Sequence, residues 1–93
     1  MEIELTHRAE EDLEYWKKTG NKRVLKKIRT LLENILLTPF SGIGKPESLK
    51  YDLSGKWSRH ITKSNRIIYQ VNGDIVYVYS FKGHYKDLLK EQK

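Results

Sequence analysis

Short runs of alternating residues, separated by turns, fill most of the stretch from Gly44 to Tyr69, GKPESLKYDLSGKWSRHITKSNRIIY. Alternation of apolar and polar residues is typical of β-strands, and glycine, serine and asparagine are typical of the turns between them. Strands are therefore predicted over residues 49–53, 57–62 and 66–71. Strands joined by such short turns run antiparallel, because a parallel connection needs a dozen or more residues. The stretch thus restricts the second half of the chain to an antiparallel meander.

A fourth strand is predicted directly after this stretch. Asn72-Gly73, extended by Asp74, is a strong hairpin signal. The run that follows it, IVYVYSF over residues 75–81, is the most apolar strand of the chain. We expect this strand to lie at the centre of the sheet with both of its faces buried.

The first half of the chain is predicted to form one strand and two helices. Apolar and acidic residues alternate over residues 1–5, as in a short strand. A helix is expected over residues 6–20, where Thr6 can act as the N-cap and Gly20 as the C-cap. A second helix is expected over residues 21–38, where Asn21 can act as the N-cap and the proline at 39 ends the helix. Its apolar positions recur at steps of four and three residues and form one stripe: Val24, Ile28, Leu31 and Ile35.

These elements predict one α+β domain over residues 1–93, with the order β-α-α-β-β-β-β. Two amphipathic helices can cover only one face of a sheet. We therefore expect an antiparallel-rich, twisted sheet with both N-terminal helices packed on one face. The opposite face of the sheet would then be available for a functional site.

Composition narrows the classes of function. The chain has no cysteine, which excludes a disulfide, a thiolate nucleophile and a cysteine-based metal site. No signal peptide and no apolar run of membrane-spanning length are visible. The net charge is +6, and residues 38–93 carry most of the excess, with ten Lys or Arg and five Asp or Glu. This charge suits a polyanion such as nucleic acid, although it is also ordinary for a small domain.

Three ionisable residues stand at strand ends that an antiparallel sheet can bring together. Glu47 precedes the strand at 49–53, Arg66 begins the strand at 66–71, and His84 follows the last strand. RNA can be cut when its own 2′-OH attacks the neighbouring phosphate, a reaction that needs a base, an acid and a cation. Glu47 could be the base, His84 the acid and Arg66 the cation, with no metal and no other cofactor.

Each of these three residues also has an ordinary structural explanation. Glu47 could pair with Lys45, and Arg66 could be a surface residue at the start of a strand. His84 could form a simple pair with Tyr85 at the end of the sheet. Spacing alone favours these explanations, because a motif without its structural context is only a hypothesis.

The other two histidines are not expected to take part in chemistry. His7 and His60 are predicted to be surface residues. Three scattered histidines without close acidic neighbours predict no metal site. A Ser-His-Asp arrangement and a glycine-rich phosphate loop are also missing from the sequence.

Cations and aromatic rings are interleaved along the predicted strands. Single-stranded RNA is bound by such combinations, because cations contact phosphates and rings stack on bases. Lys50 and Arg59 could contact phosphate, and Tyr51 and Tyr85 could stack on bases, whereas Trp57 is expected to be half buried. The face that each side chain occupies depends on the hairpin register, because a slip of one residue inverts it.

Several longer motifs are shared with one known family. They are YW at residues 15–16, TPF-x-G-x-GKPE-x-LK at 38–50, LSG-x-WSR at 53–59, IT at 61–62, R-x-x-Y at 66–69 and GHY at 83–85. With these motifs the chain resembles the YoeB/Txe toxins, part of the RelE-like group of bacterial toxin–antitoxin ribonucleases. The resemblance spans almost the whole chain, and the second and third motifs are its most specific part.

This resemblance implies a ribonuclease that cleaves mRNA, chiefly in the A site of the ribosome, without a metal, and leaves a 2′,3′-cyclic phosphate. It implies catalytic roles for three residues and RNA contacts for three more: Glu47, Arg66 and His84, and Lys50, Arg59 and Tyr85. A RelE/YoeB-like fold is implied as well.

The resemblance also implies partners and a location. It predicts a cytoplasmic toxin, away from membranes, that is silenced by a cognate acidic antitoxin, and it leaves a homodimer open. Two alternatives from other classes remain. One is a non-catalytic module that binds RNA or the ribosome, and the other is a relative of the same fold that poisons DNA gyrase.

Overall fold

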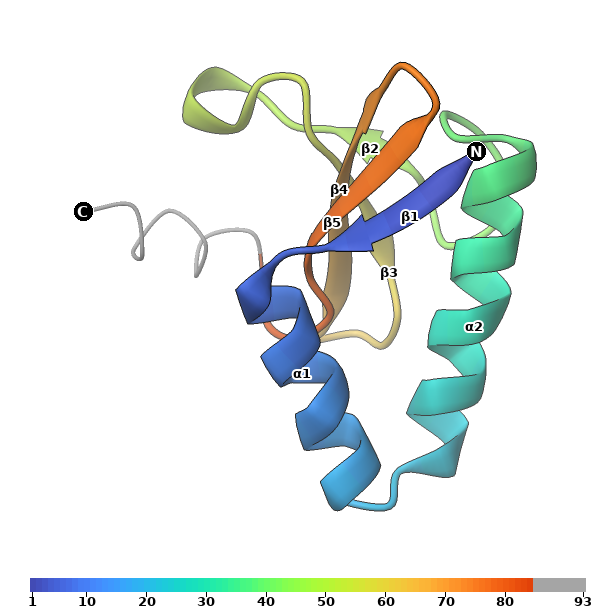
Figure 1. Cartoon of the computed structure of the whole chain (residues 1–93), viewed down its shortest axis with the longest axis vertical. Helices are drawn as coiled ribbons and strands as arrows, with labels where there is room; N and C mark the ends of the chain where they lie inside the picture. Colours follow the sequence, from blue (N-terminus) through green and yellow to red (C-terminus); the bar gives the residue numbers. More distant parts are fainter. Residues whose placement is uncertain (85–93) are drawn as a thin grey trace.

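Residues 1–84 are described by the computed structural model, and within them five strands and two helices follow the predicted order (Figure 1). The elements are β1 (Glu2–Leu5), α1 (His7–Lys18), α2 (Lys22–Leu37), β2 (Glu47–Ser48), β3 (Trp57–His60), β4 (Arg66–Asn72) and β5 (Ile75–Ser80). A short 3₁₀ helix, Tyr51–Leu53, lies between β2 and β3. Neither helix of this part of the chain is long and apolar enough to cross a membrane.

Both helices begin at the caps that the sequence predicts. The Thr6 side chain accepts a hydrogen bond from the N–H of Ala9, and the Asn21 side chain accepts one from Val24. The two helices run antiparallel and are joined by a short turn (Figure 1). Each helix has one buried stripe, formed by Ala9, Asp12 and Trp16 in α1 and by Val24, Ile28, Leu31 and Ile35 in α2.

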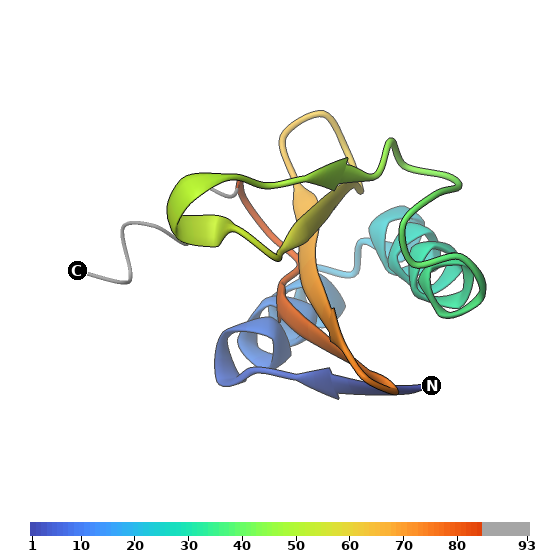
Figure 2. The ribbon, with the colours of Figure 1, turned by 90° about the horizontal axis from the view of Figure 1, so that it is seen from above.

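The sheet is mixed, with the strand order β1-β5-β4-β3-β2. β2, β3, β4 and β5 pair antiparallel, as the meander predicts, whereas β1 pairs parallel with β5. Figure 2 shows the twist of the sheet, which has β1 and β2 at its opposite edges. The predicted α+β class and the antiparallel-rich sheet are therefore confirmed, with one parallel pair at the edge that β1 forms.

The helices cover one face of the sheet, and a smaller apolar cluster lies on the other. The large cluster joins both helices to alternate residues of the two inner strands: Ile67, Tyr69, Val76 and Val78. Ile68, which lies between two of these residues, points to the opposite face because side chains alternate along a strand. There it packs against Leu49, Leu53 and Tyr79. The second face is thus only partly covered by apolar side chains.

The prediction of a strand over residues 49–53 is wrong. β2 ends at Ser48, and the segment after it turns into the 3₁₀ helix. Tyr51 has a φ of 58°, in the left-handed region that an extended strand does not contain. Leu49 and Leu53 are both buried on the second face. Residues four apart can share one side of a helical turn as well as one side of a strand, so their spacing did not distinguish the two.

The predicted central position of the strand at 75–81 is also wrong. β4 lies in the middle of the sheet and has three consecutive fully buried residues, Ile67, Ile68 and Tyr69. β5 alternates instead between buried and partly buried positions. Its Tyr77 and Tyr79, which made the run look continuously apolar, are only partly buried.

Candidate active site

The register of β3 places its polar side chains on opposite faces of the sheet. Directly paired residues of antiparallel strands share a face, and the pairs here are His60 with Arg66 and Ser58 with Glu47. Alternate residues of one strand also share a face. Glu47, His60 and Arg66 therefore lie on the face away from the helices. Arg59, between two of these positions, lies on the helix side.

Arg66 is fixed at the start of β4 by hydrogen bonds to two neighbouring segments. Its backbone N–H donates to the carbonyl oxygen of Gly83 at 3.0 Å. Its Nη1 donates to the carbonyl oxygens of Lys63 at 2.8 Å and Thr62 at 3.3 Å. The bond to Gly83 joins β4 to the segment that carries His84. The structure thus brings Arg66 and His84 to the same end of the sheet.

Glu47 reaches this end of the sheet from the edge that β2 forms. The carbonyl oxygen of Gly44 accepts a hydrogen bond from the N–H of His60 at 2.7 Å, which holds the loop before Glu47 against β3. Glu47 is exposed and forms no ion pair within residues 1–84. The alternative pairing with Lys45 is therefore not formed.

His60 lies among the three predicted catalytic residues. Burial lowers the pKa of its partly buried imidazole, and the positive charges of Arg66 and Lys45 lower this pKa further. The charge of Glu47 opposes this change, and His84 contributes a small lowering. His60 is partly exposed, in line with its predicted surface position, but its place among these charged residues was not predicted. Its only signal in the sequence was its place in a strand that pairs with the strand begun by Arg66.

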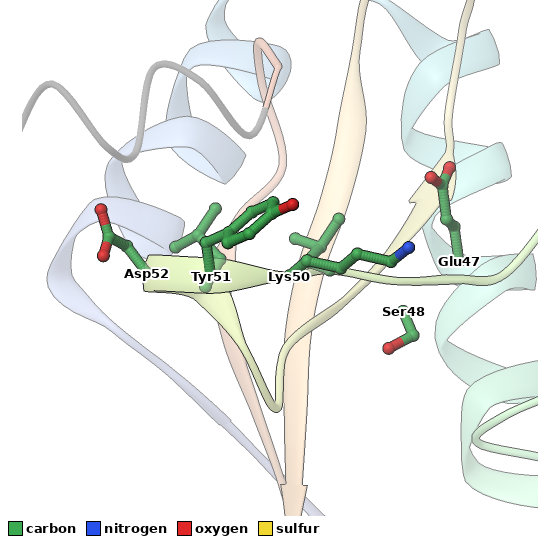
Figure 3. A pocket seen from close by; sticks show the side chains of 7 residues that line it. Glu47, Ser48, Lys50, Tyr51 and Asp52 are labelled. Atoms are coloured by element: carbon green, nitrogen blue, oxygen red, sulfur yellow. The ribbon is translucent and has the colours of Figure 1, made fainter.

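A pocket of about 290 Å³ lies beside Glu47 and is lined by residues 47–53. Figure 3 shows the side chains of Glu47 and Lys50 extending from this one segment, with the Lys50 ammonium group directed toward Glu47. Tyr51 is 91% exposed, so its ring is available to a ligand. The predicted RNA contact Lys50 is therefore next to the predicted base.

Arg59 is fully buried, so the prediction that it contacts RNA is wrong. Its guanidinium donates five hydrogen bonds: Nε to Tyr69 Oη (3.0 Å), Nη1 to Asn34 Oδ1 (2.5 Å) and Ile43 O (3.1 Å), and Nη2 to Thr38 O (2.6 Å) and Ser41 O (2.9 Å). These bonds fasten the loop between α2 and β2 to β3 and to α2. Because this loop leads to Glu47, Arg59 acts on the site by positioning the loop.

The other residues named from the sequence have simpler outcomes. Tyr85 lies outside the described residues. Trp57 is partly buried, as expected, and its ring centroid is 5.0 Å from that of Phe40. Over residues 1–84, no three His, Asp or Glu side chains are grouped in a way that could hold a metal ion.

The arrangement brings a carboxylate, an imidazole and a guanidinium to one partly open face, with the second imidazole, that of His84, at the same end of the sheet. The carboxylate and the imidazoles can accept or donate protons, and the guanidinium can stabilise a developing negative charge. Such a set supports acid–base chemistry on an anionic substrate.

Comparison with known proteins identifies the family. The profile described as "YoeB-like toxin of bacterial type II toxin-antitoxin system" matches residues 5–85. Toxin YoeB of Escherichia coli K12 is 41% identical over 85 residues, which are 91% of this chain and the whole of that protein. The solved YoeB/ParE toxin from Agrobacterium tumefaciens is 40% identical with a TM-score of 0.87, over 91% of this chain and 100% of that one.

Two solved structures from Staphylococcus aureus add information on assembly. One is a heterotetrameric YoeB–YefM toxin–antitoxin complex, with 38% identity and a TM-score of 0.82 over 89% of this chain and 95% of that one. The other is a YoeB dimer, with 37% identity and a TM-score of 0.84 over 91% of this chain and 98% of that one. The present chain belongs to the YoeB family, the toxins of bacterial type II toxin–antitoxin systems.

Proposed function

We propose that this toxin is an endoribonuclease that cleaves mRNA in the A site of the ribosome and thereby inhibits translation. The observation that supports it best is the shared face of Glu47 and Arg66, with His84 at the same end of the sheet. This face is not covered by the helices, and the chain has a net charge of +6. A positively charged protein attracts RNA over a long range.

The proposed reaction is a transesterification within the RNA. Glu47 removes the proton of a ribose 2′-OH, and the 2′-oxygen forms a bond to the adjacent phosphorus. The bond between phosphorus and the 5′-oxygen breaks, and His84 gives a proton to the departing 5′-oxygen. The products are a 2′,3′-cyclic phosphate and a free 5′-hydroxyl. No electron transfer and no co-reactant are needed.

Arg66 stabilises the extra negative charge that the phosphorane carries in this reaction. Its Nη1 is held by the carbonyl oxygens of Lys63 and Thr62, so the guanidinium is oriented before the substrate binds. A cation that is already in place lowers the barrier without a further reorganisation cost. Lys50, next to the base, binds a neighbouring phosphate of the mRNA.

We further infer the partners of this toxin from its relatives and its charge. The S. aureus relative forms a complex with the YefM antitoxin, and an acidic antitoxin would be attracted to the present chain by the charge that attracts RNA. The dimer of the same relative supports a homodimer here. A ribosomal target would place the activity in the cytoplasm.

The first experiment measures cleavage of mRNA on purified ribosomes by mapping the new 5′ ends. We expect His84→Gln and Glu47→Gln each to reduce the cleavage rate by about 10²–10⁴-fold. The matched controls His7→Gln and Glu11→Gln change an exposed pair on α1 and should cleave at the wild-type rate. Cleavage at the wild-type rate by His84→Gln would contradict its role as the acid.

A second measurement separates the reaction from mere binding. A toxin that binds ribosomes but produces no new 5′ ends, even as the wild-type chain, would overturn the proposed endoribonuclease. Coexpression with the cognate antitoxin should abolish the cleavage of mRNA. Cleavage that persists with an equimolar antitoxin bound would contradict the proposed inhibition.

A further inference from the structure

His60 occupies the middle of the candidate active site without a structural task that explains its side chain. It belongs to neither apolar cluster, and its imidazole makes no hydrogen bond within residues 1–84. Its backbone is nevertheless held firmly, because its N–H donates to Gly44 and its Cα is paired with that of Arg66. An imidazole on a fixed backbone and with an unused donor can bind a ligand.

The groups around His60 come from every element that approaches it. Arg66 is contributed by β4, Lys45 by the loop before β2, Glu47 by β2, and His84 by the segment after β5. The charges of two cations, Arg66 and Lys45, thus lower the pKa of the imidazole, and the charge of one carboxylate, Glu47, raises it. In the free protein this surrounding positive charge favours the neutral imidazole.

We propose that His60 binds a phosphate of the RNA substrate beside Arg66 and takes up a proton from water when it does so. The inference rests on the proposed function, since RNA must approach this face of the sheet. A phosphodiester has one negative charge, which offsets the field of Arg66 and Lys45. The protonated imidazole then donates a charge-assisted hydrogen bond to a phosphate oxygen. Substrate binding and protonation of His60 are therefore coupled, and each favours the other.

This coupling predicts a specific dependence of RNA affinity on pH. Above the pKa of the bound imidazole, His60 is neutral in the complex and the charge-assisted bond is lost. Affinity should thus fall as the pH rises through the range in which histidine titrates. An arginine at this position would keep its charge throughout the range and remove this part of the pH dependence.

The direct experiment is a ¹H–¹³C NMR titration of the full chain, with and without an oligomer of 2′-deoxyadenylate. This probe has phosphates but no 2′-OH, so the toxin cannot cleave it by the proposed reaction. We expect the Hε1 resonance of His60 to titrate at a clearly higher pH when the oligomer is bound. The resonance of His7, which is exposed on α1 away from this face of the sheet, is the internal control. An unchanged midpoint for His60 with the oligomer bound would overturn the proposal.

Variants test the same coupling through affinity. Between about pH 5.5 and about pH 8, wild-type affinity for the oligomer should fall at least about tenfold more than that of His60→Gln. His60→Arg should bind tightly at both values, and His7→Gln should follow the wild type. Equal pH dependence in wild type and His60→Gln, with both chains folded by circular dichroism, would overturn the proposal.

The outcome also separates this inference from the proposed function. A raised His60 midpoint together with undiminished cleavage by His84→Gln would retain the phosphate site and contradict the assigned acid. Loss of cleavage in His84→Gln together with an unchanged His60 midpoint would retain the ribonuclease mechanism and exclude His60 from phosphate binding.

Discussion

The hydroxyl of Tyr69 joins Arg59 to the loop that leads into the candidate active site. It accepts a hydrogen bond from Arg59 Nε at 3.0 Å and donates one to the carbonyl oxygen of Pro39 at 2.6 Å. Burial raises the pKa of Tyr69, while Arg59 opposes this change. The hydroxyl therefore keeps its proton at neutral pH and can donate it to Pro39. The guanidinium and the phenol together fix the chain before Glu47.

Replacing Arg59 by lysine should destabilise the protein strongly. Lysine has three donors for the five hydrogen bonds that the guanidinium makes, so buried acceptors are left without partners. We expect Arg59→Lys to lower the free energy of unfolding by about 2–4 kcal/mol, measured by urea denaturation. Arg29→Lys, on the exposed side of α2, should change it by less than about 0.5 kcal/mol. Equal effects of the two variants would contradict this role of Arg59.

The contribution of the Tyr69 hydroxyl to stability should depend in part on Arg59. Tyr69→Phe removes one acceptor and one donor, so we expect it to lower the free energy of unfolding by about 1–2 kcal/mol. In a double-mutant cycle with Arg59→Lys, the coupling energy should exceed about 0.5 kcal/mol, because the two groups touch. Additive losses would show that the two side chains act independently.

Gly44 should tolerate alanine much less well than Gly20 does. Both have positive φ angles, +80° and +67°, so a side chain strains the backbone at either position. A Cβ at Gly44 would also lie 2.7 Å from Leu31 Cδ2 and 3.2 Å from Arg59 Cβ, whereas one at Gly20 meets nothing within 4 Å. We expect the free energy of unfolding to fall by about 1 kcal/mol in Gly20→Ala and by about 2–4 kcal/mol in Gly44→Ala.

The same pair of glycine variants also reports on the site. Because the Gly44 carbonyl is bonded to the N–H of His60, Gly44→Ala should shift the amide resonance of His60. Gly20→Ala, at the end of α1, should leave it unchanged. An unshifted His60 amide in a folded Gly44→Ala chain would contradict the role of this hydrogen bond in holding the loop against β3.

Lys50 should contribute one phosphate contact to the binding of single-stranded RNA. Its ammonium group is exposed beside Glu47 (Figure 3). We expect Lys50→Ala to reduce the slope of log affinity against log salt concentration by about 0.7, the value for one counterion released from a single strand. Lys18→Ala, on the exposed end of α1, should leave the slope unchanged. Equal slopes for wild type and Lys50→Ala would remove Lys50 from the RNA interface.

Asp12 should make stability depend on pH in the acid range. Burial raises the pKa of this carboxyl group above 3.8, although the hydrogen bond from the Phe81 N–H and the charge of Arg8 each lower it. Its folded form therefore binds a proton more readily than its unfolded form, and its contribution to stability is full below pH 3.8. That contribution is lost as the pH rises through the pKa of the folded protein.

The variant Asp12→Asn tests this sign. In the wild-type structure the Phe81 N–H donates to Asp12 Oδ2 at 3.0 Å. Asparagine stays neutral and can still accept this hydrogen bond. Urea denaturation from about pH 3 to about pH 7 should show the variant gaining stability relative to wild type as the pH rises. The exposed Glu10→Gln serves as the control. A constant difference between Asp12→Asn and wild type would exclude a raised pKa.

Local sequence patterns were sufficient to predict the two helices and the order of the elements. The stripe from Val24 to Ile35 and the caps Thr6 and Asn21 are local features, and the structure reproduces them. The segment at 49–53 was predicted wrongly, because the left-handed conformation of Tyr51 arises where Leu49 and Leu53 both turn onto Ile68. That contact depends on β4, which is distant in sequence, so a local pattern could not reveal it.

The sequence by itself determined the family, the α+β class and the residue types that the proposed chemistry needs. Only the tertiary structure decided which of these side chains point to the open face. Neighbouring residues of a strand point to opposite faces, so one step in β3 separates the buried Arg59 from His60 at the site. Strand pairing and the loop bonds to Arg59 fix this register, and both are contacts between segments that lie far apart in the chain.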